Sequence, residues 1–259
     1  MNYEIRICCF IDILGFKNHI NQTINENGED NIEKIIKIKS ILELSKNITD
    51  DLGFCKSKVI TYFSDSIVLS YKYDEPSQLF YTLLDLLYVS FELANKGFLT
   101  RGGVSIGKLI HTKEFIFGPA LNKAYEIESE KAYFPRIIVD EKVIKNGLDY
   151  RKKINSEKDE NESIMNILTL DDDGMYYIDY ITNSSSEFDD LEYDLYYYLT
   201  RLQGHYFQNY NNEVPEVKKK LDWLKTKLNL YIRQIKSNVK NRNFSAEIVE
   251  LYTSLKELS

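Results

Sequence analysis

Two aspartates, Asp12 and Asp65, are the residues of this 259-residue chain whose type and setting point most directly to chemistry. Each lies at the end of a β-rich run and beside a turn, and 65 − 12 = 53 positions separate them. If the two strands are neighbours in one sheet, the carboxylates converge. Mg²⁺ and Mn²⁺ favour such sites, with one or two carboxylates plus phosphate oxygens. An aspartate beside a turn also commonly caps backbone groups, so both interpretations stay open on the residues alone.

The turn after Asp12 adds a second indication. Gly15 permits a backbone turn whose N–H groups approach a phosphate closely. Metal ions held beside it would polarise a phosphorus centre and lower the pKa of an attacking hydroxyl. The sequence therefore raises phosphoryl chemistry at the end of the first strand as a hypothesis.

The elements that must position these residues follow from hydrophobic periodicity. The order of strands, helices and hairpins predicts an α+β fold with helices on one face of a sheet, and the charged segment 151–163 is expected to be a surface loop. After a polar linker the chain becomes helical, so we divide it into residues 1–182 and a helical appendage, 183–259. The expected strands are 3–12, 59–63, 67–71, 98–110, 136–140, 167–170 and 175–180, and the expected helices are 31–46, 74–94, 119–132, 188–207, 215–236 and 245–258.

Composition excludes several classes of protein. With 33 Lys+Arg against 40 Asp+Glu, the formal charge of −7 argues against stable nucleic-acid binding by bulk positive charge. Hydrophobic residues at 43% and aromatics at 13% exclude intrinsic disorder. No run of about 18 apolar residues and no signal-peptide pattern occurs, so we expect a cytoplasmic protein without a membrane segment. The three cysteines, Cys8, Cys9 and Cys55, form no CxxC pair that would indicate zinc binding. The nine basic residues within 218–242 form either a solvated face or a contact surface for RNA, membrane or an acidic partner.

Three segments resemble, in order and spacing, the conserved blocks of the class III nucleotidyl cyclase catalytic domain. They are FIDILGF at 10–16, FSDS at 63–66 and GPALNKAYEIE at 118–128. The resemblance is closest to the Pycsar-type pyrimidine cyclases of bacterial antiphage defence. It extends over nearly the whole chain, through RGG at 101–103, PRI at 135–137 and LDWLKTKLN at 221–229.

This resemblance implies a ferredoxin-like cyclase sandwich with a mixed or antiparallel sheet. It also implies two divalent metal ions per site, Mn²⁺ or Mg²⁺, held by Asp12, Asp65 and the backbone carbonyl of Ile13. The turn through Gly15 and Phe16 would cradle the triphosphate of the substrate. In the family the sites lie at the interface of a homodimer.

One departure from the family pattern concerns the transition state. Asn122 matches the asparagine that orients the ribose from the partner subunit, but the arginine expected four residues later is Glu126. A cation must then come from elsewhere. Arg101 is the first candidate, with Lys108 and Lys123 behind it, although Arg101 could equally form an ion pair at a strand edge.

A second departure concerns the base. The positions where purine cyclases carry a lysine and an aspartate fall here on Thr61 and near Gly97, so a purine reader is missing. By strand alternation Phe10 would share the face of Asp12, and Thr61 that of Asp65. Both could line a base pocket or simply pack in the sheet.

The implied reaction converts a pyrimidine nucleoside triphosphate, UTP or CTP, into its 3′,5′-cyclic monophosphate and pyrophosphate. The product would be a second messenger of antiphage defence that a downstream effector protein recognises. Two alternatives stay open: a catalytically silent cyclase-homology module that binds a nucleotide or a partner, and a cyclase that uses ATP or GTP.

Overall fold

A mixed sheet with β1 near its middle organises the chain. The computed structural model describes residues 2–46, 56–148, 155–239 and 244–259, and Cys55 lies outside this part. The strand order is β2-β3-β1-β4-β6-β8-β7, with the short β5 paired to the end of β4. All neighbouring strands are antiparallel except β4 and β6. The strands are β1 (Glu4–Ile13), β2 (Val59–Phe63), β3 (Ser66–Lys72), β4 (Thr100–His111), β5 (Ile116–Phe117), β6 (Ile137–Val139), β7 (Leu168–Leu170) and β8 (Tyr176–Ile178).

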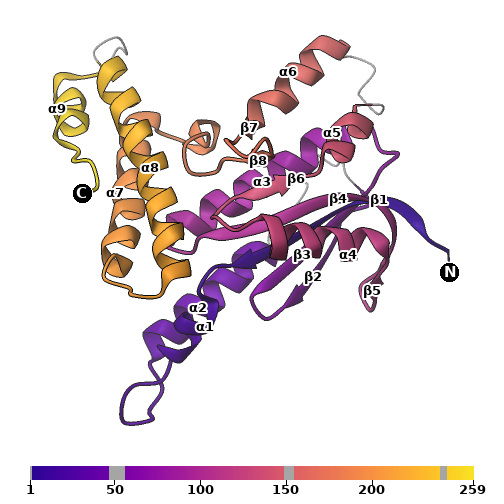
Figure 1. Cartoon of the computed structure of the whole chain (residues 1–259), viewed down its shortest axis with the longest axis horizontal. Helices are drawn as coiled ribbons and strands as arrows, with labels where there is room; N and C mark the ends of the chain where they lie inside the picture. Colours follow the sequence, from indigo (N-terminus) through magenta and orange to yellow (C-terminus); the bar gives the residue numbers. More distant parts are fainter. Residues whose placement is uncertain (1, 47–55, 149–154, 240–243) are drawn as a thin grey trace.

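Helices cover this sheet, so the predicted α+β fold is confirmed (Figure 1). The apolar helix α3 lies on the face formed by Ile7, Cys9 and Ile11 of β1, and together they form the main core. The helical segments are α1 (Phe16–Asn21), α2 (Ile32–Lys46), α3 (Gln78–Asn95), α4 (Pro119–Glu126), the π-helical turn η1 (Ile127–Lys131), α5 (Glu141–Gly147), α6 (Glu157–Ile167), the 3-10 turn η2 (Ser185–Glu187), α7 (Leu191–Asn209), α8 (Pro215–Asn238) and α9 (Ala246–Ser254).

The structure adds one helix on the opposite face of the sheet. Helix α4 packs there with Ala120 and Ala124 against Cys8 and Leu109. Gly103 of β4 makes this close approach possible, because a Cβ at that position would lie 2.3 Å from the carbonyl oxygen of Ala124. The sequence predicts this helix within 119–132 but places all helices on one face of the sheet. That expectation is wrong for α4, since a short helix carries too little periodicity to reveal which face it covers.

One expected loop is partly helical. Residues 157–163 belong to helix α6, while residues 151–154 lie outside the described residues. Ser156 caps the helix by accepting a hydrogen bond from the backbone N–H of Asp159. Ile164 and Ile167 anchor it in the core. The many charged residues of this segment concealed a helix with only a narrow apolar stripe.

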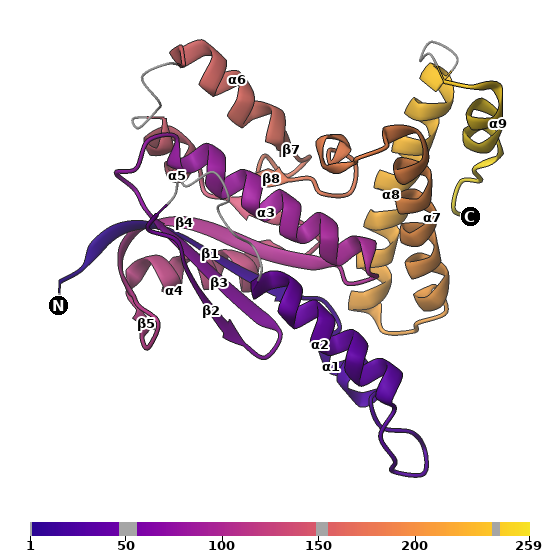
Figure 2. The same cartoon turned by 180° about the vertical axis from the view of Figure 1, so that it is seen from behind.

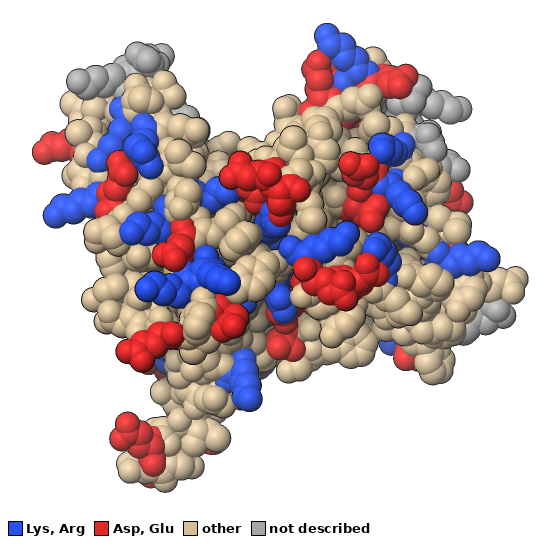
Figure 3. All heavy atoms as spheres, viewed as in Figure 1, with Lys and Arg blue, Asp and Glu red and all other residues tan. Residues whose placement is uncertain are grey.

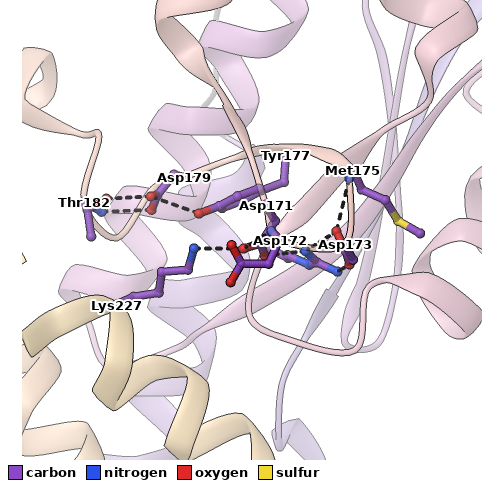
Figure 4. A network of polar contacts seen from close by, with 9 residues as sticks. Asp171, Asp172, Asp173, Met175, Tyr177, Asp179, Thr182 and Lys227 are labelled. Atoms are coloured by element: carbon purple, nitrogen blue, oxygen red, sulfur yellow. Dashed lines mark hydrogen bonds and ion pairs between the residues drawn. The ribbon is translucent and has the colours of Figure 1, made fainter. Parts of the chain in front are cut away.

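The C-terminal helices lie together at one end of the sheet (Figures 1 and 2). Leu199 of α7 and Leu228 of α8 belong to the same continuous core as Ile11 of β1. A polar network ties α8 to the turn between β7 and β8 (Figure 4): Lys227 pairs with Asp171 at 2.9 Å, and the buried Arg136 pairs with both Asp171 and Asp173. Packing and charge therefore both join these helices to the sheet.

Charges on the face seen in Figure 3 are interspersed, with Lys and Arg beside Asp and Glu over the C-terminal helices. Part of the predicted basic stretch serves internal contacts, since Lys227 pairs with Asp171 and Arg233 with Glu257. A search of the described residues finds no helix with the length and apolar character needed to cross a membrane.

Candidate active site

The structure brings Asp12 and Asp65 together at the end of β1. Asp12 pairs in register with Ser66 of β3, the residue that follows Asp65. The backbone N–H of Ile13 donates to the carbonyl oxygen of Asp65 at 3.1 Å, so the turn between β2 and β3 lies directly beside the end of β1. The negative charge of Asp65 raises the pKa of Asp12. The convergence expected from two neighbouring strands therefore occurs.

Asp12 also has a cationic partner, Arg101, directly across the strand pair. The two residues are in register on β1 and β4, and Arg101 Nε donates to Asp12 Oδ2 at 3.2 Å. Burial raises the pKa of Asp12, and the charge and hydrogen bond of Arg101 oppose that shift. Arg101 is thus the ion-pair partner of the candidate metal ligand.

Glu128 is a third acid of this cluster. It lies on η1, is 2% exposed, and its Oε1 lies 2.7 Å from the Arg101 guanidinium. Burial raises the pKa of Glu128, and the charge of Asp12 adds to that shift. In the sequence Glu128 is the last residue of the segment GPALNKAYEIE. Its signal was a glutamate one turn after the buried Ala124, on the same face of the helix.

Lys220 of α8 approaches the cluster from the C-terminal helices. Its charge lowers the pKa values of Asp12 and Glu128, and its own pKa is lowered by burial and by the charge of Arg101. No sequence pattern singled out Lys220, because it is the third lysine of a run of three and only tertiary packing turns it inward.

The turn after Asp12 has the conformation that a glycine favours. Gly15 has φ = +71° and precedes α1, and its surroundings would leave a Cβ without contacts within 4 Å. Phe16, by contrast, is 4% exposed and belongs to the main core. The backbone of this turn is available to a ligand, but the side chain of Phe16 serves packing.

Phe10 and Thr61 share one face of the sheet. Both are in register with Val68, so Thr61 lies on the face of Phe10 and Asp12. Asp65 lies in the turn between β2 and β3, so the shared face of Thr61 and Asp65 stays a prediction. Phe10 packs edge-on against Tyr125 of α4, with ring centroids 5.3 Å apart.

Thr61 has a partner that the sequence did not indicate. Its Oγ1 lies 2.8 Å from Nε2 of His111, whose Nδ1 lies 2.7 Å from Oγ of Ser70. His111 is 6% exposed, and burial with the nearby charge of Arg6 lowers its pKa to about 4. A neutral imidazole therefore holds the Thr61 hydroxyl.

The structure does not bring Asn122 into this cluster. Asn122 lies on the exposed side of α4, and no described side-chain contact joins it to Asp12 or Asp65. Lys123 pairs with Glu126 at 2.5 Å on the helix surface. Lys108 is seven residues along β4 from Arg101, about 23 Å at 3.3 Å per residue. Of the three candidate cations, only Arg101 is near the acids.

The donor set fits a divalent metal only in part. Within the described residues no group of three or more His, Cys, Asp or Glu has a metal-binding arrangement. Asp12 and Asp65 offer two carboxylates beside the backbone of Ile13. Mg²⁺ commonly takes one or two carboxylates and completes its shell with substrate phosphates and water. These residues therefore match a site that is completed by a phosphate substrate.

Comparisons with known proteins give the following results. No protein-family model matches the chain, and no curated protein matches it. Among solved structures it is similar to a bacterial light-regulated adenylyl cyclase, with 19% identity and a TM-score of 0.42 over 56% of this chain and 80% of that one. It is also similar to the adenylyl cyclase CyaB from P. aeruginosa, with 12% identity and a TM-score of 0.43 over 68% of this chain and 94% of that one.

Proposed function

We propose that this protein is a metal-dependent nucleotidyl cyclase that converts a nucleoside triphosphate into its 3′,5′-cyclic monophosphate and pyrophosphate. The observation that carries the proposal is the convergence of Asp12 and Asp65 beside the Gly15 turn. Two carboxylates next to a turn with accessible backbone suit a substrate that is both phosphorylated and metal-bound. The motif resemblance supplies the reaction class.

Asp12, Asp65 and the carbonyl of Ile13 would hold the metal ions. When bound, Mg²⁺ or Mn²⁺ would polarise the phosphates and lower the pKa of the ribose 3′-hydroxyl. The chain's own task is to keep Asp12 ionised although it is partly buried. Arg101 and Lys220 do this, because their charges lower the pKa that burial raises.

The substrate that we propose is a pyrimidine nucleotide, UTP or CTP. Support comes from Thr61, which stands where a purine-reading lysine is expected and is hydrogen-bonded to the neutral His111. Phe10, on the same face, offers an aromatic surface beside Tyr125. A role of the product as an antiphage messenger, read by an effector protein, extends the same resemblance.

We further propose that the active form is a homodimer with residues 1–182 as the catalytic part. Asn122 is exposed on α4 and is therefore accessible to the site of another copy. Exposed aromatic residues occur in this part of the chain and would be covered in such a dimer: Phe63, Phe115, Phe117 and Tyr125. Residues 183–259 would brace the catalytic part or regulate it.

The test is incubation of the protein with each of the four nucleoside triphosphates and Mn²⁺, followed by identification of the products by mass. We expect a cyclic monophosphate from UTP or CTP and pyrophosphate in equal amount. Cyclisation of ATP or GTP instead would overturn the pyrimidine assignment. Absence of any cyclic product, under conditions where the protein is folded and dimeric, would overturn the cyclase assignment in favour of a silent binding module.

A further inference from the structure

A cavity of about 700 Å³ is lined both by the C-terminal helices and by earlier parts of the chain. Helices α1 and α2 and the end of α3 form one side of it, and helices α7 and α8 form the other. Figures 1 and 2 show these elements meeting at the end of the sheet where α1 and α2 project. The cavity is therefore built jointly by two parts of the chain that are far apart in sequence.

The lining of this cavity is basic and contains no Asp or Glu. The carboxylates that act on its lysines, such as Glu33 on Lys37 and Glu216 on Lys220, are not part of the lining. None of Lys34, Lys37 and Lys96 forms an ion pair with a carboxylate in the part of the chain that the structure describes. The lining cations are Lys34, Lys37, Lys96, Arg201 and Lys220.

Two of the three histidines of the chain also line the cavity, His19 and His205. The His19 ring packs against Phe98 at 4.3 Å between ring centroids, and Lys37 lies over the same Phe98 ring. Burial and the charges of Lys37, His205 and Lys34 lower the pKa of His19 to about 4. The pKa of His205 is lowered in the same way, chiefly by burial. Burial, with a smaller contribution from the nearby lysine charges, thus keeps both imidazoles neutral.

The cavity is distinct from the candidate active site. Asp12, Asp65, Phe10 and Thr61 are absent from its lining. The two regions meet at Gly15, and Lys220 lies between them because it lines the cavity and also acts on Asp12.

We propose that this cavity binds a compact phosphate polyanion, either an inorganic di- or triphosphate or the phosphate chain of a nucleotide, without a metal ion. Five cations that converge without lining carboxylates leave a positive potential that such an anion would neutralise. Lysine and arginine are the residues that recognise phosphate by charge and by several hydrogen bonds. The site goes beyond the proposed cyclase reaction and does not depend on it.

A bound anion would also fasten the C-terminal helices to the rest of the chain. Lys34 and Lys37 come from α2, whereas Arg201 and Lys220 come from α7 and α8. Like charges on opposite walls repel each other, and a polyanion between them turns that repulsion into attraction. Occupancy would therefore stabilise the position of Lys220, which borders the active site.

The first test measures binding of tripolyphosphate by calorimetry in excess EDTA. We expect saturable binding to the wild type and a rise in Tm of about 5 °C at a hundredfold excess over Kd. Lys37→Gln should weaken binding about tenfold, since it removes one charged partner. The matched control is Lys39→Gln on the same helix, whose lysine is exposed, pairs with Glu43 and lies outside the lining, and it should leave Kd unchanged.

The second test locates the anion by NMR. The chain has three histidines, of which His111 lies outside the cavity and serves as an internal reference. Tripolyphosphate should move the ring resonances of His19 and His205 and raise their pKa values, while His111 stays unchanged. UTP in EDTA is compared with tripolyphosphate. Equal affinity identifies the phosphate chain as the ligand, and tighter binding of UTP identifies a nucleotide.

Three results would overturn the proposal. One is the absence of binding in EDTA. Another is an equal effect of Lys37→Gln and Lys39→Gln, because binding would then follow overall charge. The third is binding of tripolyphosphate that leaves the ring resonances of His19 and His205 unchanged, which would place the anion outside the cavity. The two proposals fail independently. Cyclase activity without binding in EDTA would contradict only the anion site, and binding in EDTA without cyclase activity would contradict only the cyclase.

Discussion

Arg101 of β4 and Glu128 of η1 form an ion pair of 2.7 Å between the sheet and the end of the helix that covers it. The same Arg101 donates to Asp12, so one guanidinium is shared by a buried glutamate and the candidate metal ligand. Glu128 therefore influences how strongly Arg101 holds Asp12. We regard Glu128 as a positioning residue, because it acts on the site through Arg101.

The first prediction concerns Glu128→Gln. Burial raises the pKa of Glu128 in the folded protein above its value in the unfolded chain. The folded protein therefore loses stability as the pH rises from the unfolded value to that raised pKa. The amide removes this cost, and we expect a Tm at pH 7.5 equal to or above that of the wild type, with no difference below about pH 4, where the wild-type residue is protonated in both states. Arg101 would then bind Asp12 alone and compete with metal, raising the Mn²⁺ concentration for half-maximal activity about fivefold.

Glu130→Gln is the control for that variant, because Glu130 lies two residues further on and is exposed. It should change neither Tm nor the Mn²⁺ requirement. A Glu128→Gln protein with a lower Tm and an unaltered Mn²⁺ requirement would assign Glu128 to packing alone.

The second prediction concerns Asp65→Asn. Loss of one of two carboxylates should lower kcat about 10³-fold, since metal polarisation contributes several kcal/mol to the barrier. Stability should change little, because Asp65 lies in a turn at the surface. Turnover with Mn²⁺ and thermal unfolding measure the two effects. Asp74→Asn is the control, because Asp74 is an exposed aspartate in the turn after β3, and it should keep full activity. An Asp65→Asn enzyme of similar activity would refute the mechanism.

The third prediction concerns pH and His111. Its pKa of about 4 lies below the usual 6.5, so the neutral ring adds stability above pH 6.5 that is lost as the pH falls toward 4. Between pH 7 and pH 5 this loss should be about 2 kcal/mol for His111. His111→Gln should be less stable at pH 7 and lose correspondingly less on acidification. Urea unfolding at both pH values gives the comparison, and parallel losses in the two proteins would contradict the assignment.

The fourth prediction concerns the approach of α4 to β4. In Gly103→Ala the new methyl group would lie 2.3 Å from the carbonyl oxygen of Ala124, so α4 and η1 must move away from the strand. We expect a loss of about 2 to 3 kcal/mol in the free energy of unfolding, together with reduced activity because Glu128 moves with η1. Gly204→Ala in α7 is the control. No atom lies within 4 Å of its new methyl group, so chemical denaturation should report equal or slightly higher stability.

Much of the fold follows from local pattern. The strand ending at Asp12, the hairpin around Asp65 and the helix before Gly97 all have a periodicity that strand or helix geometry imposes on a short segment. Segment 157–163 does not have a clear helical periodicity, because its many charged residues leave only a narrow apolar stripe. The expectation of helices on one face was also wrong for α4, since its few residues do not reveal which face of the sheet the helix covers.

The sequence by itself determined that Asp12 and Asp65 end β-rich runs, that a glycine turn follows Asp12, and that the elements have an α+β order. These features depend on neighbours within a few residues. Only the tertiary structure decided that Glu128 and Lys220 approach Asp12, that His111 holds Thr61, and that lysines of α2 meet Arg201 across a cavity. These contacts depend on how distant elements pack. The residues next to a charged side chain in the sequence do not indicate on which face it will be buried. The positive cavity is the clearest case, since its lining is drawn from both ends of an acidic chain.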